Sequence, residues 1–282
     1  MLCKRKRGMA MRALSGAVAV AGLWLWLLLA ASAPARAGII DGLVGNWTFD
    51  ISGNLGDDST ANNNDGTAYA GVSYSTGSQG IGAGNSHVTG SGAALFNGTA
   101  TGYVRVPDSA SLDSAAGTAL SRSVAFWFKT TANQNLVVLE KGTNTHFVIQ
   151  TEGGANAGKV SWRVDTTNTP RVFSSAAVND GLWHHFAATY SGAGNVMELY
   201  IDGIFQGANV QASPMANNSP LVIGARDGGS YPFPGTMDDL AVWSRVLTSR
   251  EVRAIYQGGV AGTSLADVVV PPEVPPTYTA YT

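Results

Sequence analysis

The sequence predicts an all-β protein, a two-sheet antiparallel sandwich with one short α-helix near its C-terminus. Short runs of aromatic, β-branched and small residues recur along the chain, and clusters of Gly, Pro, Asn and Asp separate them at the interval typical of an antiparallel sandwich. Many of these runs alternate their apolar side chains with period two, as strands do. One segment, after the last predicted strand, combines a helix start signal with helical spacing.

The first 37 residues are predicted to form a signal peptide that directs export. A basic stretch opens the chain, residues 17–31 are apolar, and Ala35-Arg36-Ala37 has the small-x-small form of a cleavage site. We expect cleavage after Ala37. The alternative is an uncleaved membrane anchor, because no charged residue lies between Arg12 and Arg36.

Removal of this segment makes the chain acidic. Six of the 17 Lys and Arg residues lie in it and none of the 19 Asp and Glu, so 11 basic residues face 19 acidic ones, a net charge of −8. Such a surface disfavours binding to nucleic acid and, after signal cleavage, to anionic membranes. The single cysteine, Cys3, is also removed, which excludes a disulfide, a thiolate metal site and a cysteine nucleophile.

The first predicted strand carries Trp47 and Phe49, and residues 52–66 after it form a loop rich in Asp and Asn. This composition is typical of a solvated turn, but oxygen-rich loops also bind Ca²⁺; the spacing is not that of an EF-hand. Residues 69–92 predict a long surface loop with at most a weak strand. Regular strands resume at Ala94 and are expected within residues 94–98, 103–108, 123–129, 147–149 and 160–164.

A β-hairpin is predicted over residues 179–203, the central feature of the pattern. Asn179-Asp180-Gly181 supplies turn chemistry before the first strand, residues 191–195 close the hairpin, and Asp202-Gly203 opens the next tight turn. Neither face of the first strand is strongly polar, so we expect this strand to be central and covered on both sides.

The predicted helix begins after Thr248, which forms a capping box with Glu251. Apolar side chains then repeat at helical spacing, and Gly258-Gly259 is expected to stop the helix. Beyond Gly262 the composition becomes rich in Val and Pro, which predicts an extended linker or tail over residues 263–282.

These segments, in this order, resemble the laminin-G-like domains of the concanavalin A-like lectin/glucanase superfamily. The resemblance is carried by Trp-Thr-Phe-Asp at 47–50, by the hairpin signature Gly-Leu-Trp-His-His-Phe-Ala-Ala-Thr-Tyr at 181–190, and by the closing stretch 235–243. It implies a jelly-roll sandwich over residues 38–262, between the signal peptide 1–37 and the tail 263–282. It specifies fold far more than activity, because one fold hosts many functions.

Catalysis is not expected. His184 and His185 are adjacent on a strand and point to opposite faces, so they cannot act on one ion or one substrate atom; we expect one of them to be buried and hydrogen-bonded. Polysaccharide hydrolases of this superfamily use two Glu residues on one strand, whereas the five Glu after residue 37 include no such pair. Glu198 with Asp202 is the nearest approach to one.

The predicted function is therefore carbohydrate binding without catalysis, by a secreted or cell-surface protein whose partner is a glycan or another extracellular surface component. Sugar recognition uses exposed aromatic rings and a few polar groups, and the loop 227–235 offers Asp227, Tyr231 and Phe233. Phe233 could instead pack under the loop. The alternatives are a structural or protein-interaction domain of the same fold and a degenerate polysaccharide hydrolase.

A structural Ca²⁺ is also predicted. The family resemblance places it between the early loop and the closing strand, at the positions of Asp58, Asn63 and Asp238. Strand alternation independently puts Asp238 on the core face with Leu240 and Val242, where an ionised carboxylate is costly unless a cation or several donors meet it. The alternative is that Asp238 only accepts backbone N–H bonds.

Overall fold

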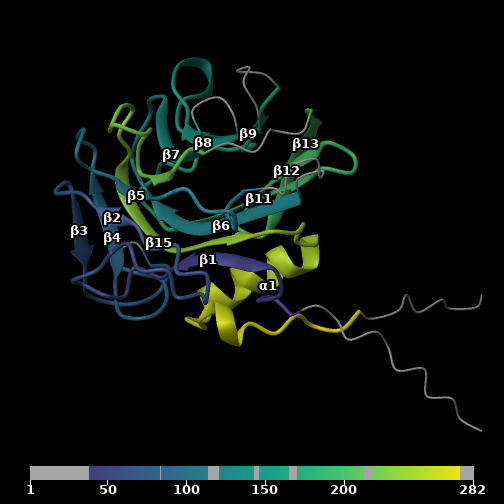
Figure 1. The fold of residues 1–282 in the computed structure, drawn as a ribbon, viewed down its shortest axis with the longest axis horizontal. Helices are drawn as coiled ribbons and strands as arrows, with labels where there is room; N and C mark the ends of the chain where they lie inside the picture. The colour runs from purple at the N-terminus through teal and green to yellow at the C-terminus, as the bar shows by residue number, and fades with distance from the viewer. Residues whose placement is uncertain are drawn as a thin grey trace, which may run out of the picture. The chain divides into compact units, whose positions relative to one another are not determined.

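A computed structural model describes residues 38–82, 84–113, 121–142, 146–164, 170–212 and 218–273. The signal-peptide prediction and the last nine residues of the tail lie outside them. Two antiparallel sheets pack face to face, and α1 (Ser249–Val260) lies on the outer side of one of them (Figure 1). Two short 3₁₀ turns complete the elements, η1 (Gly154–Asn156) and η2 (Leu265–Asp267). The predicted all-β two-sheet sandwich with one C-terminal α-helix is confirmed.

Sheet A contains eight of the described strands. In pairing order they are β13 (Ile204–Val210), β12 (Val196–Ile201), β11 (His184–Ser191), β6 (Ser121–Lys129), β15 (Pro234–Trp243), β4 (Ala93–Asn97) and β3 (Val72–Ser75), with β1 (Leu43–Trp47) also paired to β15.

Sheet B contains seven. In pairing order they are β10 (Val172–Phe173), β9 (Val160–Val164), β8 (Phe147–Thr151), β7 (Leu136–Lys141), β14 (Leu221–Ile223), β5 (Val104–Val106) and β2 (Thr67–Ala68).

The main core lies between the two sheets. Alternate residues of each strand supply it, as the period of a strand requires: Phe126 and Phe128 from β6, and Phe186 from β11, are at most 1% exposed. The predicted hairpin is present, with β11 paired to β12 on one side and to β6 on the other, and both of its faces are covered.

A second apolar layer fills the space between the outer face of sheet A and α1, with Trp243 and Ile255 among its buried members. Helix α1 begins as predicted, because Thr248 accepts a hydrogen bond from the Glu251 backbone N–H and the Glu251 carboxylate accepts one from the Thr248 backbone N–H.

The prediction for the helix end was wrong. Helix α1 continues through Gly258 and Gly259 to Val260, and the residue with a left-handed backbone is Gly262, at φ +70°. A Cβ atom on Gly259 would lie 2.5 Å from the Trp127 indole nitrogen. Gly259 is thus required because the helix packs closely on sheet A.

The boundary predicted at residue 262 is also too early. Leu265 is buried in the layer beneath α1, and Val268 and Val270 pack against that layer. The segment from 263 to 270 therefore belongs to the folded domain.

Candidate functional site

The loop between β14 and β15 displays one of the predicted aromatic residues. Tyr231 is 53% exposed and has a left-handed backbone, at φ +55°. Its carbonyl accepts a hydrogen bond of 2.9 Å from the Val137 backbone N–H, so β7 holds the turn in place. A left-handed backbone costs a non-glycine residue about 1–3 kcal/mol, and such positions cluster at functional sites.

Phe233, in contrast, is not a surface residue. Its side chain is fully buried in the main core, where its ring lies 6.3 Å from that of Phe96. The expectation that Phe233 contacts a ligand is wrong, because the turn that exposes Tyr231 returns the chain to β15 with Phe233 pointing inward.

Asp227 connects this loop to strand β5. Its Oδ1 accepts a 2.9 Å hydrogen bond from Arg105 Nε, and both side chains are exposed at the surface. Tyr103, directly before β5, stacks on Tyr69 with ring centroids 4.3 Å apart and an interplanar angle of 23°. The Tyr69 ring is 38% exposed and covers Tyr103.

Arg226 completes the arrangement. Its guanidinium carbon lies 5.0 Å from the centre of the Tyr231 ring, a cation–π contact. Its Nε lies 3.4 Å from an oxygen of Glu140, a buried residue of β7. We call the set Tyr69, Tyr103, Arg105, Arg226, Asp227 and Tyr231 the tyrosine–arginine surface.

The ionisation states on this surface follow from its contacts. The hydrogen bond from Arg105 to Asp227 raises the pKa of Arg105, so the guanidinium stays charged. Burial raises the pKa of the Tyr103 hydroxyl, and a hydrogen bond with Tyr69 adds to the shift. The Tyr103 phenol therefore remains protonated near neutral pH, and the surface offers aromatic rings, hydroxyl groups, a guanidinium and a carboxylate.

Sequence reasoning found Asp227 and Tyr231 but missed the rest. Period-two alternation places Tyr103 and Arg105 on one face, opposite Val104 and Val106. That signal could have identified the pair. Tyr69 follows a strand of two residues, and no pattern in the nearby sequence predicts that its ring stacks on Tyr103.

Among the described residues, no hydrogen bond joins any two of the three predicted calcium ligands. Asp58 accepts four hydrogen bonds within its own part of the chain, from the backbone N–H groups of residues 46, 60 and 64 and from the Thr60 hydroxyl. Asn63 is exposed, with φ +50°. In the part of the chain that the structure describes, no three His, Cys, Asp or Glu side chains group so as to hold a metal ion. Asp58 is engaged within its own loop, and a calcium site formed by Asp58, Asn63 and Asp238 stays a prediction.

Asp238 lies on the face opposite to the predicted one. A β-bulge in β15 inserts Asp239 at φ +50°, so Met237 and Leu240 face the main core while Asp238 shares the outer face with its strand partner Trp127. The Asp238 carboxylate accepts hydrogen bonds from the backbone N–H groups of residues 88, 89 and 239. Burial raises its pKa, and the charge of Asp239 adds to the effect.

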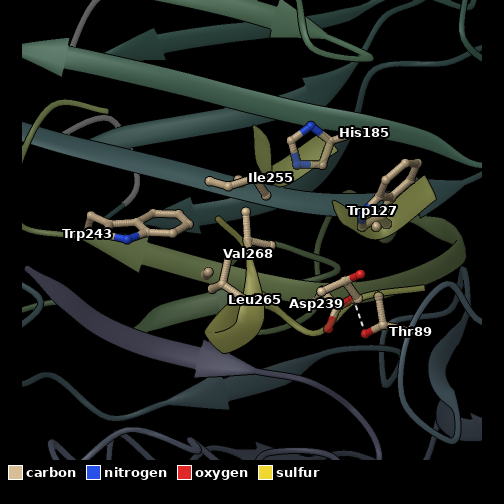
Figure 2. Close-up of a pocket in the computed structure, with 12 residues that line it drawn as sticks. Thr89, Trp127, His185, Asp239, Trp243, Ile255, Leu265 and Val268 are labelled. Carbon is tan, nitrogen blue, oxygen red and sulfur yellow. Dashed lines mark hydrogen bonds between the residues drawn. The ribbon is translucent and has the colours of Figure 1, made fainter. Parts of the chain in front are cut away.

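Figure 2 shows a cavity beneath α1, lined by Trp127 and His185 of sheet A, Ile255 of α1 and Leu265 after it. Asp239 lies at one end, where it accepts a 2.7 Å hydrogen bond from the Thr89 hydroxyl. The cavity measures about 20 Å³, room for a water molecule and none for a sugar.

His185, one of the adjacent histidines, lines this cavity. Neither of its ring nitrogens has a hydrogen-bond partner among the described residues, and burial lowers its pKa to about 4, so it is neutral at pH 7. The buried histidine is therefore not the hydrogen-bonded one that we expected.

His184, on the opposite face of β11, is held between two carboxylates. Its ring nitrogens lie 2.8 Å from Asp202 and 3.2 Å from Asp180. Glu198 and Asp202 are the two residues that come nearest to a catalytic carboxylate pair in the sequence. The Glu198 carboxylate accepts a 2.7 Å hydrogen bond from the Tyr200 hydroxyl. Glu198 and Asp202 thus belong to separate hydrogen-bond groups.

Comparisons with known proteins agree with the fold. A laminin G family model, described as the concanavalin A-like lectin/glucanases superfamily, matches residues 97–253. The chain is 24% identical over 177 residues to the Rattus norvegicus protein "Sushi, von Willebrand factor type A, EGF and pentraxin domain-containing protein 1". That alignment covers 57% of this chain and 5% of the length of the rat protein.

Two solved structures illustrate the same fold. Domain 4 of AbnA, a GH43 extracellular arabinanase from Geobacillus stearothermophilus, was solved with arabinotriose; it is 20% identical, with a TM-score of 0.55 over 76% of this chain and 98% of that one. The ligand-binding domain of botulinum neurotoxin serotype D, solved with N-acetylneuraminic acid, is 13% identical, with a TM-score of 0.57 over 77% of this chain and 51% of that one.

Proposed function

The chain belongs to the concanavalin A-like lectin/glucanases superfamily, and on this premise we propose that it is a non-catalytic carbohydrate-binding module of a secreted or cell-surface protein. The observation that carries the proposal is the tyrosine–arginine surface. Exposed Tyr69 and Tyr231 supply ring faces for the apolar side of a sugar, and Arg105 with Asp227 supplies a donor and an acceptor for its hydroxyls.

Export is part of the proposal and rests on the sequence of residues 1–37. Among the described residues, no helix combines the length and the apolar character needed to cross a membrane. Absence of catalysis is likewise proposed from the sequence, because no two Glu residues after residue 37 pair on one strand. The separate hydrogen-bond partners of Glu198 and Asp202 support this proposal.

A glycan array with the purified protein tests the proposal. We expect binding to at least one glycan, and about tenfold or greater loss of affinity in Tyr231→Ala. The matched control is Phe205→Ala on β13, because Phe205 is 52% exposed and Tyr231 53%. Equal loss in both variants, or binding that Tyr231→Ala leaves intact, would argue against this surface.

A protein-interaction role is the second candidate, and one observation favours it. Strand β13 is at the edge of sheet A and exposes Ile204, Phe205 and Val210. An exposed apolar edge strand is a ready site for pairing with another chain. If the array shows no glycan binding, and Phe205→Ala rather than Tyr231→Ala abolishes capture of a protein partner, this role replaces the first.

A further inference from the structure

The tyrosine–arginine surface carries two cations, and each has a carboxylate of the protein beside it. Arg105 Nε bonds to Asp227 Oδ1 at 2.9 Å, and Arg226 Nε lies 3.4 Å from Glu140. These contacts bear directly on the charge of any saccharide that the surface can accept.

Recognition of an acidic sugar requires a cation that can turn its charge toward the ligand. A guanidinium that meets a carboxylate in the fork-to-fork manner uses two parallel N–H groups. On this surface the Nε edge of Arg105 is already occupied by Asp227, and the Arg226 guanidinium lies against the Tyr231 ring with its Nε toward Glu140. An acidic sugar would therefore approach two carboxylates that are already in place.

Glu140 cannot move aside. Its side chain is 1% exposed, on a strand of sheet B whose neighbours are β14 and β8. The Glu140 carboxyl group is thus held in place beside Arg226. The net charge of −8 that follows from removal of residues 1–37 adds a general repulsion for anions.

The hydroxyl groups of an uncharged sugar, in contrast, can bind to the hydrogen-bonding groups of this surface that remain exposed. A single hydrogen bond joins Arg105 to Asp227, and the Asp227 side chain is 44% exposed. The Asp227 carboxylate can accept a hydrogen bond from one sugar hydroxyl, while an N–H group of the adjacent Arg105 guanidinium donates to a neighbouring hydroxyl. The faces of the tyrosine rings pack against the apolar side of a sugar and do not require a charged ligand.

We propose that the tyrosine–arginine surface selects uncharged saccharides over those that carry a carboxylate or a sulfate. This inference rests on the proposed carbohydrate-binding function and names the class of ligand. Asp227 is the residue that sets the selectivity at the accessible end of the surface.

The test compares pairs of oligosaccharides of equal length that differ only in a carboxylate, with the full exported protein in low salt. We expect the uncharged member of each pair to bind at least about tenfold more tightly, with little dependence on salt. Asp227→Asn should weaken binding of the uncharged member. It should also reduce the ratio of the two affinities, because the positive charge of Arg105 is then no longer balanced by a carboxylate. The control variant is Asp267→Asn in η2, which removes the same charge outside the tyrosine–arginine surface. It should change neither the affinity for the uncharged member nor the ratio of the two affinities.

The outcomes separate this inference from the proposed function. If acidic members bind as tightly as uncharged ones or more so, the inference is overturned while carbohydrate binding stands. An unchanged preference in Asp227→Asn would also overturn the role of that residue. Binding of no saccharide by the unmodified protein would overturn both.

Discussion

Tyr231 and Phe233 are two residues apart, yet one lies on the surface and the other in the core. The sequence places both aromatic rings between glycine and proline residues, and nothing local distinguishes them. The difference arises because Tyr231 has a left-handed backbone and because Phe233 begins the return to β15, where Phe96 contacts it. The sequence could predict an aromatic loop here, but not which ring a ligand would meet.

Stability measurements should separate the two residues. Phe233→Ala removes a fully buried ring and should lower the free energy of unfolding by about 3–5 kcal/mol. Tyr231→Ala, at an exposed position, should lower it by less than about 1 kcal/mol. Urea unfolding of both variants checks this, and equal losses would show that the assignment of inner and outer ring is incorrect.

His184 should make stability depend on pH. Its hydrogen bond with Asp202 raises its pKa above the value in the unfolded chain. The stabilisation from this residue is therefore complete below the unfolded pKa of about 6.5 and is lost as pH rises through the folded pKa. The difference in unfolding free energy between the unmodified protein and His184→Gln should be larger at about pH 6 than at about pH 9. A difference that does not change with pH would contradict this account.

At the scale of elements, the sequence predicted strands and the helix start well and the irregular positions poorly. The capping box of Thr248 and Glu251 is local and appears as predicted. The bulge at Asp239 and the passage of α1 through Gly258 and Gly259 depend on neighbouring elements. The same is true of the contact between Tyr69 and Tyr103, which joins the ends of two strands.

Gly259 gives a test of how α1 packs. Alanine is normally about 1 kcal/mol better than glycine inside a helix, so a glycine that only ended the helix would gain stability on substitution. Because a Cβ atom would lie 2.5 Å from Trp127, we expect Gly259→Ala to lose about 1–3 kcal/mol instead. Urea unfolding gives the sign of the change in unfolding free energy. An increase in Gly259→Ala would contradict close packing of α1 on sheet A at this residue.

For the whole molecule, calcium binding stays a proposal. The predicted ligands Asp58 and Asn63 share no contact with Asp238, so the proposal now rests on buried Asp238 and its neighbour Asp239, whose pKa burial raises to about 7. Calcium at about 100 times its Kd should add roughly 2.7 kcal/mol and raise the melting temperature relative to chelator.

Two variants make the calcium proposal specific. Asp238→Asn should abolish the difference between calcium and chelator, whereas Asp58→Asn should lower stability equally in both, because Asp58 organises its own loop. Identical melting curves of the unmodified protein in both conditions would mean that no such site exists.

The central claim is that β5, the residues after β2 and the β14–β15 loop together form one binding surface for a glycan. Calorimetric titration of a glycan found on the array into Tyr69→Ala, Tyr231→Ala, Tyr69→Phe and Tyr231→Phe tests it most directly. We predict that each alanine variant loses about tenfold or more in affinity, and that each phenylalanine variant, which retains the ring, loses much less. Full affinity in both alanine variants would contradict the claim.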